Sequence, residues 1–470
     1  MNKAITSHIT ASGYDRLACD IGVVHLGFGA FHRAHQAVFL DDYMAQTGDL
    51  RWGIAAVNLR AAEADSFGEH DAAGAGYLLK SVAPSGDVNL SRIRSHIAFS
   101  DWSRDRGASE ALLARASVKL VTITVTESGY YTDPNGVLDI ADPLIAAEVA
   151  GGEGTSVYAY LAAALTRRMT TINAPITISC CDNIRSNGRM LQRNFGAYLA
   201  AIGLDDLKVW VTENVTFPNS MVDRITPRAT PELAFEFAAM TGETARHPVL
   251  AEAFVQWVLE DNFATDMPDL ARVGVTITKD VDPFEVTKIR VLNGGHTCLA
   301  YLAALRGVET FDQAMQVPDL FDHFWTYETT EVLPALTLAL PFSKEAYLDS
   351  IAARFKNPAI ADTVARICAD GFAKFPIFMR PTLEGCLRQG IMPTRGIVSI
   401  ASWHVFARHV QAGKAPLDYA EPSWPLLEAM LGSDAFVLSQ QLWGDLPTTY
   451  PEFADALRTA IKEMEQSWPL

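Results

Sequence analysis

The chain has 470 residues, enough for two or three domains, and 49% of them are apolar, which excludes a disordered or disulfide-stapled protein. Its 38 basic and 55 acidic residues leave a formal net charge of −17. This acidic surplus disfavours a nucleic-acid partner and is typical of a protein kept in solution by its own charge, as a monomer or small homo-oligomer.

The N-terminal segment and the cysteines bear on where the protein works. Residues 1–17 lack the basic-then-apolar pattern of a signal peptide, and no apolar run reaches the ~18–20 residues that cross a bilayer. The six cysteines form no CxxC pair, which favours free thiols over disulfides or a structural zinc site. We therefore expect a cytoplasmic protein with no membrane anchor and no metal.

Strand-like and helix-like segments alternate in the first half of the chain. Helical stretches such as Gln36–Ala45 and Ser156–Arg168 separate continuous apolar runs. Such alternation predicts an α/β domain with a doubly wound parallel sheet of the Rossmann type, covered on both faces. The predicted strands are Ile21–Leu26, Trp52–Leu59, Val118–Val125 and Ala174–Ser179.

The pattern becomes helical after about residue 280, and no strand series follows. We place the domain boundary near residues 280–282, with a dinucleotide-binding domain over 1–280 and a mostly α-helical substrate and catalytic domain over 281–470. The predicted helices of the second domain are Pro283–Leu305, Glu345–Arg354, Ile360–Phe372 and Phe453–Met464.

A glycine-containing turn follows the first predicted strand. Gly27 and Gly29 form a G-x-G pattern that leads through Ala30 and Phe31 into a helix. The first glycine permits a tight turn, and the second lets the backbone approach a pyrophosphate at the helix N-terminus. His32 stands where the third glycine of the dinucleotide fingerprint is expected, so the pattern is incomplete.

Polar residues after the second and third strands are further candidates for cofactor binding. Asn58 is placed to bond a ribose, and Arg60 either accepts a 2′-phosphate or is an ordinary surface arginine. The choice between NAD and NADP therefore stays open. Glu127, just past the third strand, either contacts the cofactor or belongs to a plain turn.

The segment from Asp282 to His296 carries the strongest catalytic pattern. On an ideal helix, Lys288 and His296 lie about 80° apart, and Asn293 lies about 60° beyond His296. One face then presents an amine, an amide and an imidazole, with Glu285 about one turn before the lysine. The alternative is a solvated helix start in which these side chains have no catalytic or binding role.

Three other residues of this segment carry expectations of their own. Gly294 and Gly295 each cost about 1 kcal/mol relative to alanine inside a helix, which indicates that something approaches the backbone closely there. Arg290 is a candidate cation for a substrate carboxylate, but it points about 200° from Lys288 on an ideal helix, which favours a solvated charge.

A second polar segment, which contains Asn183, follows the fourth predicted strand. The carboxyl ends of parallel strands are where doubly wound sheets bind ligands. Asn183 either donates its amide to a substrate oxygen or serves as a turn residue.

These motifs together resemble the polyol-specific long-chain dehydrogenases, the mannitol dehydrogenase family. The resemblance runs from Val24 to about Lys374 and keeps the order of the family's motifs. The matching segments are GFGAFHRAHQ (27–36), TVTESGY (124–130), SCCDN (179–183), FPNSMVDRITP (217–227), QWVLEDNF (256–263) and KIRVLNGGH (288–296).

The resemblance implies an N-terminal Rossmann domain, a mostly helical C-terminal domain, an active site between them, NAD(H) as cofactor and no metal. It implies that Lys288 is the general acid/base and that Glu285 relays protons to it. Asn183 and Asn293 would hold the reacting oxygen, and His296 would orient the substrate. Arg366 and Lys374 match two cationic residues on the substrate side. The cofactor-binding candidates are Gly27, Gly29, Ala30, Phe31, Asn58, Arg60 and Glu127.

The substrate expectation rests on finer similarities. Phe28, Ala30 and the segment 57–60 look more like the fructuronate reductases of this family than its mannitol dehydrogenases. We therefore expect reduction of D-fructuronate to D-mannonate and the reverse, with mannitol 2-dehydrogenase or a related polyol activity as the alternative. A non-catalytic nucleotide-sensing protein on the same fold is a remote alternative.

Overall fold

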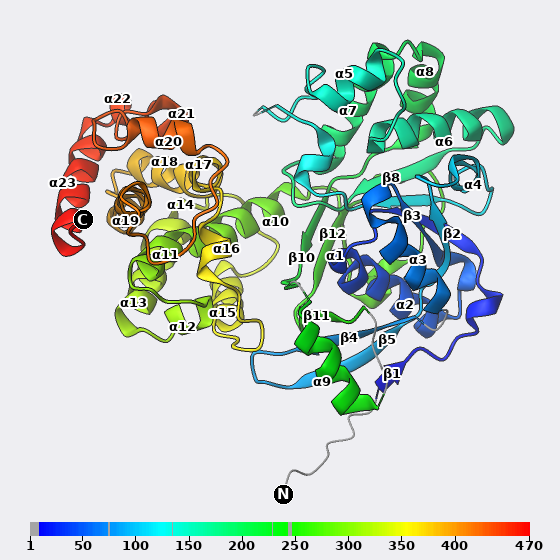
Figure 1. The fold of residues 1–470 in the computed structure, drawn as a ribbon, viewed down its shortest axis with the longest axis horizontal. Helices are drawn as coiled ribbons and strands as arrows, with labels where there is room; N and C mark the ends of the chain where they lie inside the picture. The colour runs from blue at the N-terminus through cyan, green and yellow to red at the C-terminus, as the bar shows by residue number, and fades with distance from the viewer. Residues whose placement is uncertain (1–8, 74–75, 134, 228, 243–246) are drawn as a thin grey trace, which may run out of the picture. The chain divides into compact units, whose positions relative to one another are not determined.

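The computed structural model describes residues 9–73, 76–133, 135–227, 229–242 and 247–470. The chain divides into two compact units (Figure 1). Unit 1 comprises Met1–Ala83 and Asp87–Asp282, and unit 2 comprises Pro84–Gly86 and Pro283–Leu470.

Unit 1 is built on a parallel sheet of six strands in the order β6-β3-β2-β7-β8-β9. Counted along the chain within this sheet, the order is 3-2-1-4-5-6, which is that of a dinucleotide-binding Rossmann sheet. The predicted doubly wound sheet is confirmed. The strands are β2 (Ile21–Leu26), β3 (Gly53–Asn58), β6 (His96–Asp101), β7 (Leu120–Ile123), β8 (Ile176–Cys180) and β9 (Val215–Thr216).

Both faces of this sheet are covered, which explains why its strands read as continuous apolar runs. Successive residues of β2 serve different cores: Val23 packs with Leu40, whereas Val24 packs with Leu161. All of these side chains are fully buried. The helices of unit 1 are α1 (Ala30–Ala34), α2 (Gln36–Thr47), α3 (Ala64–Ala73), α4 (Arg106–Ala111), α5 (Pro143–Val149), α6 (Val157–Thr171), α7 (Asn187–Ala201), α8 (Asp205–Asn214) and α9 (Pro231–Thr241).

Unit 1 also contains two smaller sheets that the sequence patterns did not predict. One has the order β1-β5-β4-β11 and the other the order β10-β12-β13. Their strands are short, and several pair with segments far away in the chain, so no local period marks them. The strands are β1 (Ile9–Ala11), β4 (Tyr77–Val82), β5 (Val88–Ile93), β10 (Ser220–Asp223), β11 (Val249–Glu252), β12 (Gln256–Glu260) and β13 (Thr276–Thr278).

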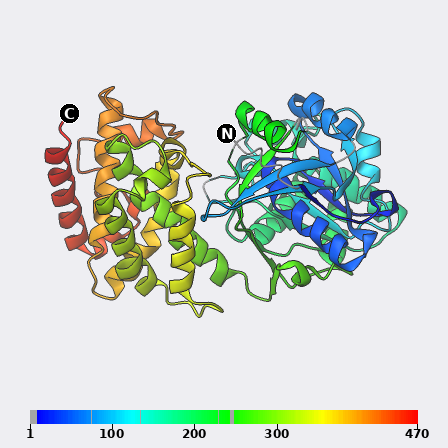
Figure 2. The same ribbon diagram turned by 90° about the horizontal axis from the view of Figure 1, so that it is seen from below.

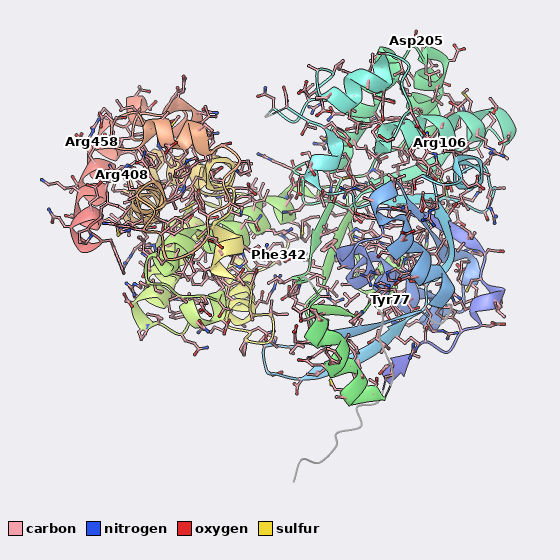
Figure 3. The ribbon with its side chains drawn as sticks, in the orientation of Figure 1. Tyr77, Arg106, Asp205, Phe342, Arg408 and Arg458 are labelled. Carbon is pink, nitrogen blue, oxygen red and sulfur yellow. The ribbon has the colours of Figure 1, made fainter. Side chains whose placement is uncertain are left out.

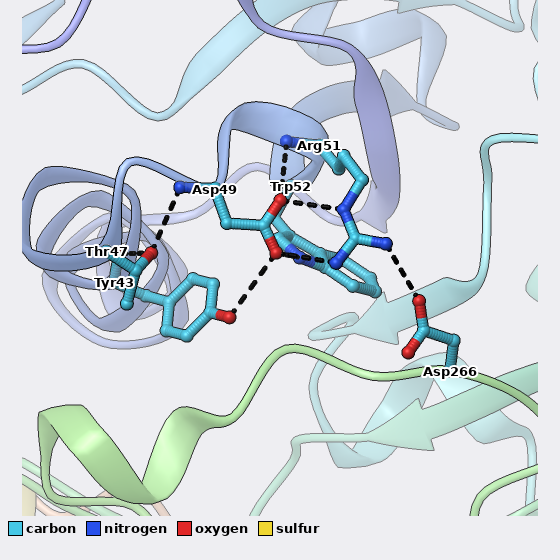
Figure 4. A network of polar contacts seen from close by, with 6 residues as sticks. All are labelled: Tyr43, Thr47, Asp49, Arg51, Trp52 and Asp266. Carbon is cyan, nitrogen blue, oxygen red and sulfur yellow. Dashed lines mark hydrogen bonds and ion pairs between the residues drawn. The ribbon is translucent and has the colours of Figure 1, made fainter.

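A polar network anchors the start of β3 (Figure 4). Asp49 accepts two hydrogen bonds of 2.7 Å from the guanidinium of Arg51 and one of 3.0 Å from the indole of Trp52. The same guanidinium reaches Asp266 at 2.9 Å. These contacts lower the pKa of Asp49 to about 2, and the hydrogen bonds from the Arg51 side chain contribute most. They hold the buried Trp52 directly before β3.

Unit 2 is helical, as predicted, and within its residues 283–470 the structure shows no strand. Its core packs around α11, with α19 and α23 lying against one another (Figure 2). Phe342, which is labelled in Figure 3, precedes α15. Its ring packs on Phe284 with ring centroids 5.3 Å apart. The α-helices are α10 (Asp282–Thr287), α11 (Gly294–Leu305), α12 (Phe311–Ala314), α13 (Pro318–Tyr327), α14 (Leu333–Ala335), α15 (Lys344–Phe355), α16 (Val364–Cys368), α17 (Gly371–Lys374), α18 (Arg380–Arg388), α19 (Thr394–Gln411), α20 (Trp424–Met430), α21 (Gln440–Trp443), α22 (Leu446–Thr449) and α23 (Pro451–Ser467).

Two helix predictions for unit 2 need correction. The predicted helix Ile360–Phe372 is two short helices, α16 and α17, because Asp370 between them has a φ of +60° and donates its N–H to Ala420 at 3.0 Å. The predicted helix Pro283–Leu305 is interrupted by a π-helix, η6 (Lys288–Asn293). Two further π-helices follow, η7 (Glu328–Val332) and η8 (Phe375–Met379). No helix among the described residues is long and apolar enough to span a membrane.

Candidate active site

The turn after β2 is held in place by the neighbouring strand end. Gly27 has a φ of +92°, and a Cβ there would lie 2.0 Å from the carbonyl oxygen of Thr124, so only glycine fits. The Gly27 carbonyl oxygen accepts hydrogen bonds from the Thr124 hydroxyl at 2.8 Å and from Nε2 of His25 at 2.9 Å. The first glycine of the predicted fingerprint is thus required by the fold itself.

Gly29 is different, because no protein atom requires a glycine there. A Cβ on Gly29 would meet only the Gly27 carbonyl oxygen, at 4.0 Å. Gly29 is also the N-cap of α1 and offers no side-chain cap to the first turn, which contains Ala30 and Phe31. An open backbone face beside the first N–H groups of a helix fits the close approach of a pyrophosphate.

Asp182, which sequence reasoning missed, holds the loop that follows β7. Its carboxylate accepts hydrogen bonds from the N–H groups of Val125 at 2.9 Å and Thr126 at 3.0 Å, and from the hydroxyl of Tyr130 at 2.6 Å. Burial, partly offset by these bonds, raises the pKa of Asp182 to about 6. Thr126 has a φ of +67°, a strained value for a residue other than glycine, and Glu127 beside it is exposed.

Asn58 does not lie free at the ribose position. Its amide donates to the carbonyl oxygen of Arg60 at 3.0 Å, and its side-chain oxygen accepts from the Arg60 N–H at 3.1 Å. Asn58 therefore shapes the loop that carries Arg60. The Arg60 guanidinium is exposed and bonds to Glu63 at 3.1 Å, so an acid offsets its charge.

A group of buried histidines packs beside the turn that follows β2, and no sequence signal marked it. The rings of His25 and His32 stack 3.2 Å apart, and Nε2 of His32 lies 2.9 Å from Nε2 of His96. Burial lowers the pKa of His25 to about 3 and holds those of His32 and His96 well below the usual value. His32, at the third-glycine position, is thus a neutral packing residue.

In unit 2, the predicted catalytic residues share one continuous helical segment. Glu285 lies in α10, Lys288 begins η6, Asn293 ends it, and His296 lies in the first turn of α11. Glu285 and Lys288 are buried. Because η6 is a π-helix, the 100° rotation per residue used for the prediction does not hold here. π-bulges inside α-helices are rare and occur frequently at functional sites.

The glycine pair at the end of η6 is explained by close packing, as expected. A Cβ on Gly295 would lie 2.8 Å from Oε1 of Glu328 and 2.8 Å from the ring of Phe324. A Cβ on Gly294 would lie 3.2 Å from the carbonyl oxygen of Phe378. The atoms that approach the backbone here belong to the protein itself.

Arg290, expected to be a solvated charge, is buried. Its Nε donates to the Thr382 hydroxyl at 2.9 Å, and its Nη1 donates to the carbonyl oxygen of Ala335 at 3.4 Å. The expectation was wrong because the face of η6 that carries Arg290 packs against α14 and α18 and does not face solvent.

His296 lies among aromatic rings and cations. Its ring stacks on Phe355 at 4.0 Å and meets Phe311 edge-on at 4.6 Å. Burial and then the nearby cations Arg366, Arg354 and Lys374 hold the pKa of His296 well below its usual value. A neutral imidazole both donates and accepts hydrogen bonds, which suits a hydroxyl-bearing ligand.

The structure brings the two predicted substrate-side cations together near His296. The guanidinium of Arg366 is exposed and forks onto the Asp362 carboxylate, at 2.5 Å for Nε. Nζ of Lys374 donates to the carbonyl oxygen of Ile367 at 2.9 Å, and burial lowers the pKa of that lysine.

Asn183 belongs to unit 1, where it lies exposed in the bend after β8. Its meeting with Lys288 and Asn293 stays a prediction. Within the described ranges of the chain, no group of three or more His, Cys, Asp or Glu side chains is arranged to hold a metal ion.

The comparisons with known proteins cover both units. Residues 21–272 match the mannitol dehydrogenase Rossmann domain, and residues 280–465 match the mannitol dehydrogenase C-terminal domain. The chain belongs to the mannitol dehydrogenase family. It is therefore an oxidoreductase of the CH–OH group that works with a nicotinamide cofactor.

Individual members of the mannitol dehydrogenase family match nearly the whole chain. A D-arabinitol 4-dehydrogenase of Ralstonia nicotianae is 37% identical over 90% of this chain and 92% of its own. A mannitol 2-dehydrogenase of Cereibacter sphaeroides is 34% identical over 98% of both chains. The structure of Pseudomonas fluorescens mannitol 2-dehydrogenase in ternary complex with NAD and D-mannitol has a TM-score of 0.86, at 29% identity over 98% of this chain and 94% of that one.

Proposed function

We propose that the protein interconverts an acyclic polyol and the corresponding ketose with NAD(H), oxidising one secondary hydroxyl. The observation that carries the proposal is the match, continuous across both units, to enzymes named for mannitol and arabinitol. This replaces the sequence-based preference for D-fructuronate, a sugar acid.

The residues of the catalytic helix supply the proton chemistry of this reaction. A bound nicotinamide would supply the hydride acceptor for the carbinol carbon in oxidation and the hydride donor in reduction. Lys288, which is buried, removes the hydroxyl proton in oxidation, a step that needs its neutral amine. Glu285 relays that proton away from Lys288.

The remaining predicted residues hold the substrate. Amide N–H groups of Asn183 and Asn293 stabilise the negative charge that develops on the reacting oxygen. His296, as a neutral imidazole, orients a neighbouring hydroxyl. Arg366 and Lys374 contact the substrate farther along its chain.

The pairing of Arg366 favours a neutral substrate. A sugar acid needs a cation whose two parallel N–H groups meet its carboxylate. On Arg366 the side-on pair, Nε and Nη2, is taken by Asp362, whose carboxylate also offsets the charge of the guanidinium. A polyol needs only single hydrogen bonds, which leave the Arg366–Asp362 pair intact.

The cofactor residues favour NAD(H). The turn of Gly27 and Gly29, with the first turn of α1 at Ala30 and Phe31, receives the pyrophosphate. Glu127 lies at the carboxyl end of β7, where such sheets bind ligands. Asn58 shapes the ribose loop, and the Glu63 carboxylate beside Arg60 disfavours the 2′-phosphate of NADP(H).

A substrate panel tests the proposal. Formation of NADH is measured with D-mannitol, D-arabinitol and D-sorbitol, and its consumption with D-fructose and D-fructuronate, each with NAD(H) and NADP(H). We expect turnover with at least one polyol and its ketose, and little with the acid. Efficient turnover of D-fructuronate alone restores the sugar-acid assignment, and no turnover with any of them favours a nucleotide-sensing protein.

The lysine has a matched control. We expect Lys288→Ala to lower kcat by roughly 10²–10⁴-fold, the usual contribution of a general acid/base. Lys279→Ala, at an exposed lysine before the catalytic helix, should leave kcat unchanged. Full activity of the Lys288 variant would refute its assigned role.

A further inference from the structure

A buried polar cluster lies against the catalytic helix. Its members are Arg290 from η6 and the consecutive residues Tyr327 and Glu328, at the junction of α13 and η7. Tyr327 and Glu328 are fully buried, and Arg290 is 8% exposed. The proposed function gives none of them a role.

These three side chains carry polar atoms without partners in the protein. They are Nη2 of Arg290, the Tyr327 hydroxyl and both carboxylate oxygens of Glu328. Buried polar groups are nearly always hydrogen-bonded, so four such atoms in one place need an explanation. Structures retain them where they hold a strained element or a reactive centre.

The cluster touches the helix at the point where its geometry is unusual. Oε1 of Glu328 would lie 2.8 Å from a Cβ on Gly295, and the Tyr327 hydroxyl 3.6 Å from one on Gly294. Gly294 is the first residue after the π-turn, and its N–H closes that turn onto the carbonyl oxygen of Ile289. The two glycines therefore let the backbone of the helix pack directly against the cluster.

Arg290 connects the cluster to the turn itself. It lies between Lys288 and Asn293, and it bonds outward to Thr382 and Ala335. Thr382 also faces the Tyr327 hydroxyl. A shift of the cluster must therefore move the backbone that carries the Lys288 amine and the Asn293 amide.

We propose that Glu328 is a positioning residue that, with Arg290 and Tyr327, holds the π-turn on which Lys288 and Asn293 are presented to the substrate. This inference rests on the proposed roles of those two residues. The carboxyl is neutral in this cluster, because burial raises its pKa well above the usual value even beside Arg290. No hydrogen bond or ion pair among the described residues joins it to that guanidinium.

Other titratable and charged groups face the cluster from the surrounding elements. α11 contributes a thiol, η7 a second glutamate, α18 a thiol and an arginine, and α19 an arginine. These groups are Cys298, Glu331, Cys386, Arg388 and Arg395.

Glu331 provides a matched control in the same π-helix. It is as buried as Glu328, but its oxygens are fully paired with the N–H groups of Arg395 at 2.7 Å and Gly396 at 2.9 Å. A change there disturbs helix packing without touching Gly294 or Gly295. Glu331→Gln should therefore lower the melting temperature and displace the pH profile of kcat less than Glu328→Leu does.

The experiment compares Glu328→Gln, Glu328→Leu and Glu331→Gln by the pH profile of kcat, KM for the polyol, NADH binding and melting temperature. Glutamine mimics a neutral carboxyl, so Glu328→Gln should keep the wild-type profile. Glu328→Leu should lower kcat by roughly 10–100-fold, the effect of about 1 Å of misplacement, and displace the profile, with NADH affinity unchanged.

Two outcomes overturn the inference: a wild-type profile in Glu328→Leu, or an equal displacement in Glu331→Gln. If Glu328→Leu fails to fold, Tyr327→Phe decides, because it removes only a hydroxyl; an unchanged kcat and profile there refutes the positioning role. Failure of the proposed function is distinguishable, because full activity of Lys288→Ala would expose it whatever the Glu328 variants do.

Discussion

The same substitution should have opposite effects at two helical glycines. Gly→Ala in a helix interior contributes about 0.8–1 kcal/mol of stability where the new methyl group has room. At Gly196 in α7, a Cβ meets nothing within 4 Å, so Gly196→Ala should be stabilising. At Gly295 in α11, the Cβ would lie 2.8 Å from both Glu328 and Phe324.

The magnitude at Gly295 depends on whether those neighbours can move. Phe324 is a rigid ring, fully buried, and Glu328 is equally buried, so neither retreats without disturbing the core. Overpacking of this kind costs about 1–3 kcal/mol, which exceeds the gain in helix propensity. We expect Gly295→Ala to be destabilising by about 1–2 kcal/mol and Gly196→Ala to be stabilising by about 0.5–1 kcal/mol.

Calorimetric melting measures both effects. For domains of this size, 1 kcal/mol corresponds to about 2–4 °C. Gly295→Ala should lower the melting temperature of the transition that belongs to unit 2 by about 2–8 °C, and Gly196→Ala should raise that of unit 1 by about 1–4 °C. A Gly295 variant as stable as the Gly196 variant would refute the packing argument.

Two further predictions concern unit 1. The pKa of Asp49 is depressed to about 2, so the stability that its carboxylate contributes is present above about pH 4 and is lost as pH falls towards 2. Asp49→Asn should lower the free energy of unfolding in urea by about 1–2 kcal/mol at neutral pH, and this loss should shrink near pH 3. An equal difference at both pH values would contradict this. Asp182→Asn leaves one of the two N–H groups of Val125 and Thr126 without an acceptor; it should cost about 1–3 kcal/mol and weaken NADH binding in a fluorescence titration, and unchanged affinity would remove that loop from the cofactor site.

The large parallel sheet could be predicted because strands that are buried on both faces are continuous apolar runs in the sequence. The strand Ile21–Leu26 has the same bounds in the structure as in the prediction. The small sheets could not, since the pairing of Leu79 with Val249 depends on segments that meet only in the folded chain.

The segment from Glu285 to His296 shows what helical spacing alone does not predict. Its candidate residues were predicted from their order and chemistry, but Arg290 was expected in solvent, because helical spacing does not show that the opposite face packs against α14 and α18. The buried side of the site was missed for a related reason. Asp182 bonds to backbone N–H groups distant in sequence, and Glu328 packs on Gly295 of another helix, and nothing in their own sequence neighbourhoods marks either contact.

The long-range pairings of unit 1 have a consequence for how the protein is made. Arg51 bonds to Asp266, 215 residues further on, and β4 pairs with β11. Loop-closure entropy makes such contacts slow to form, so domains rich in them fold slowly. During synthesis, the first half of unit 1 must therefore wait for residues up to about Thr278 before its sheets are complete. Until their partners β11 and β13 have been made, the edges of β4 and β12 stay unpaired on that side, and a nascent chain stalled there is where we expect misfolding to begin.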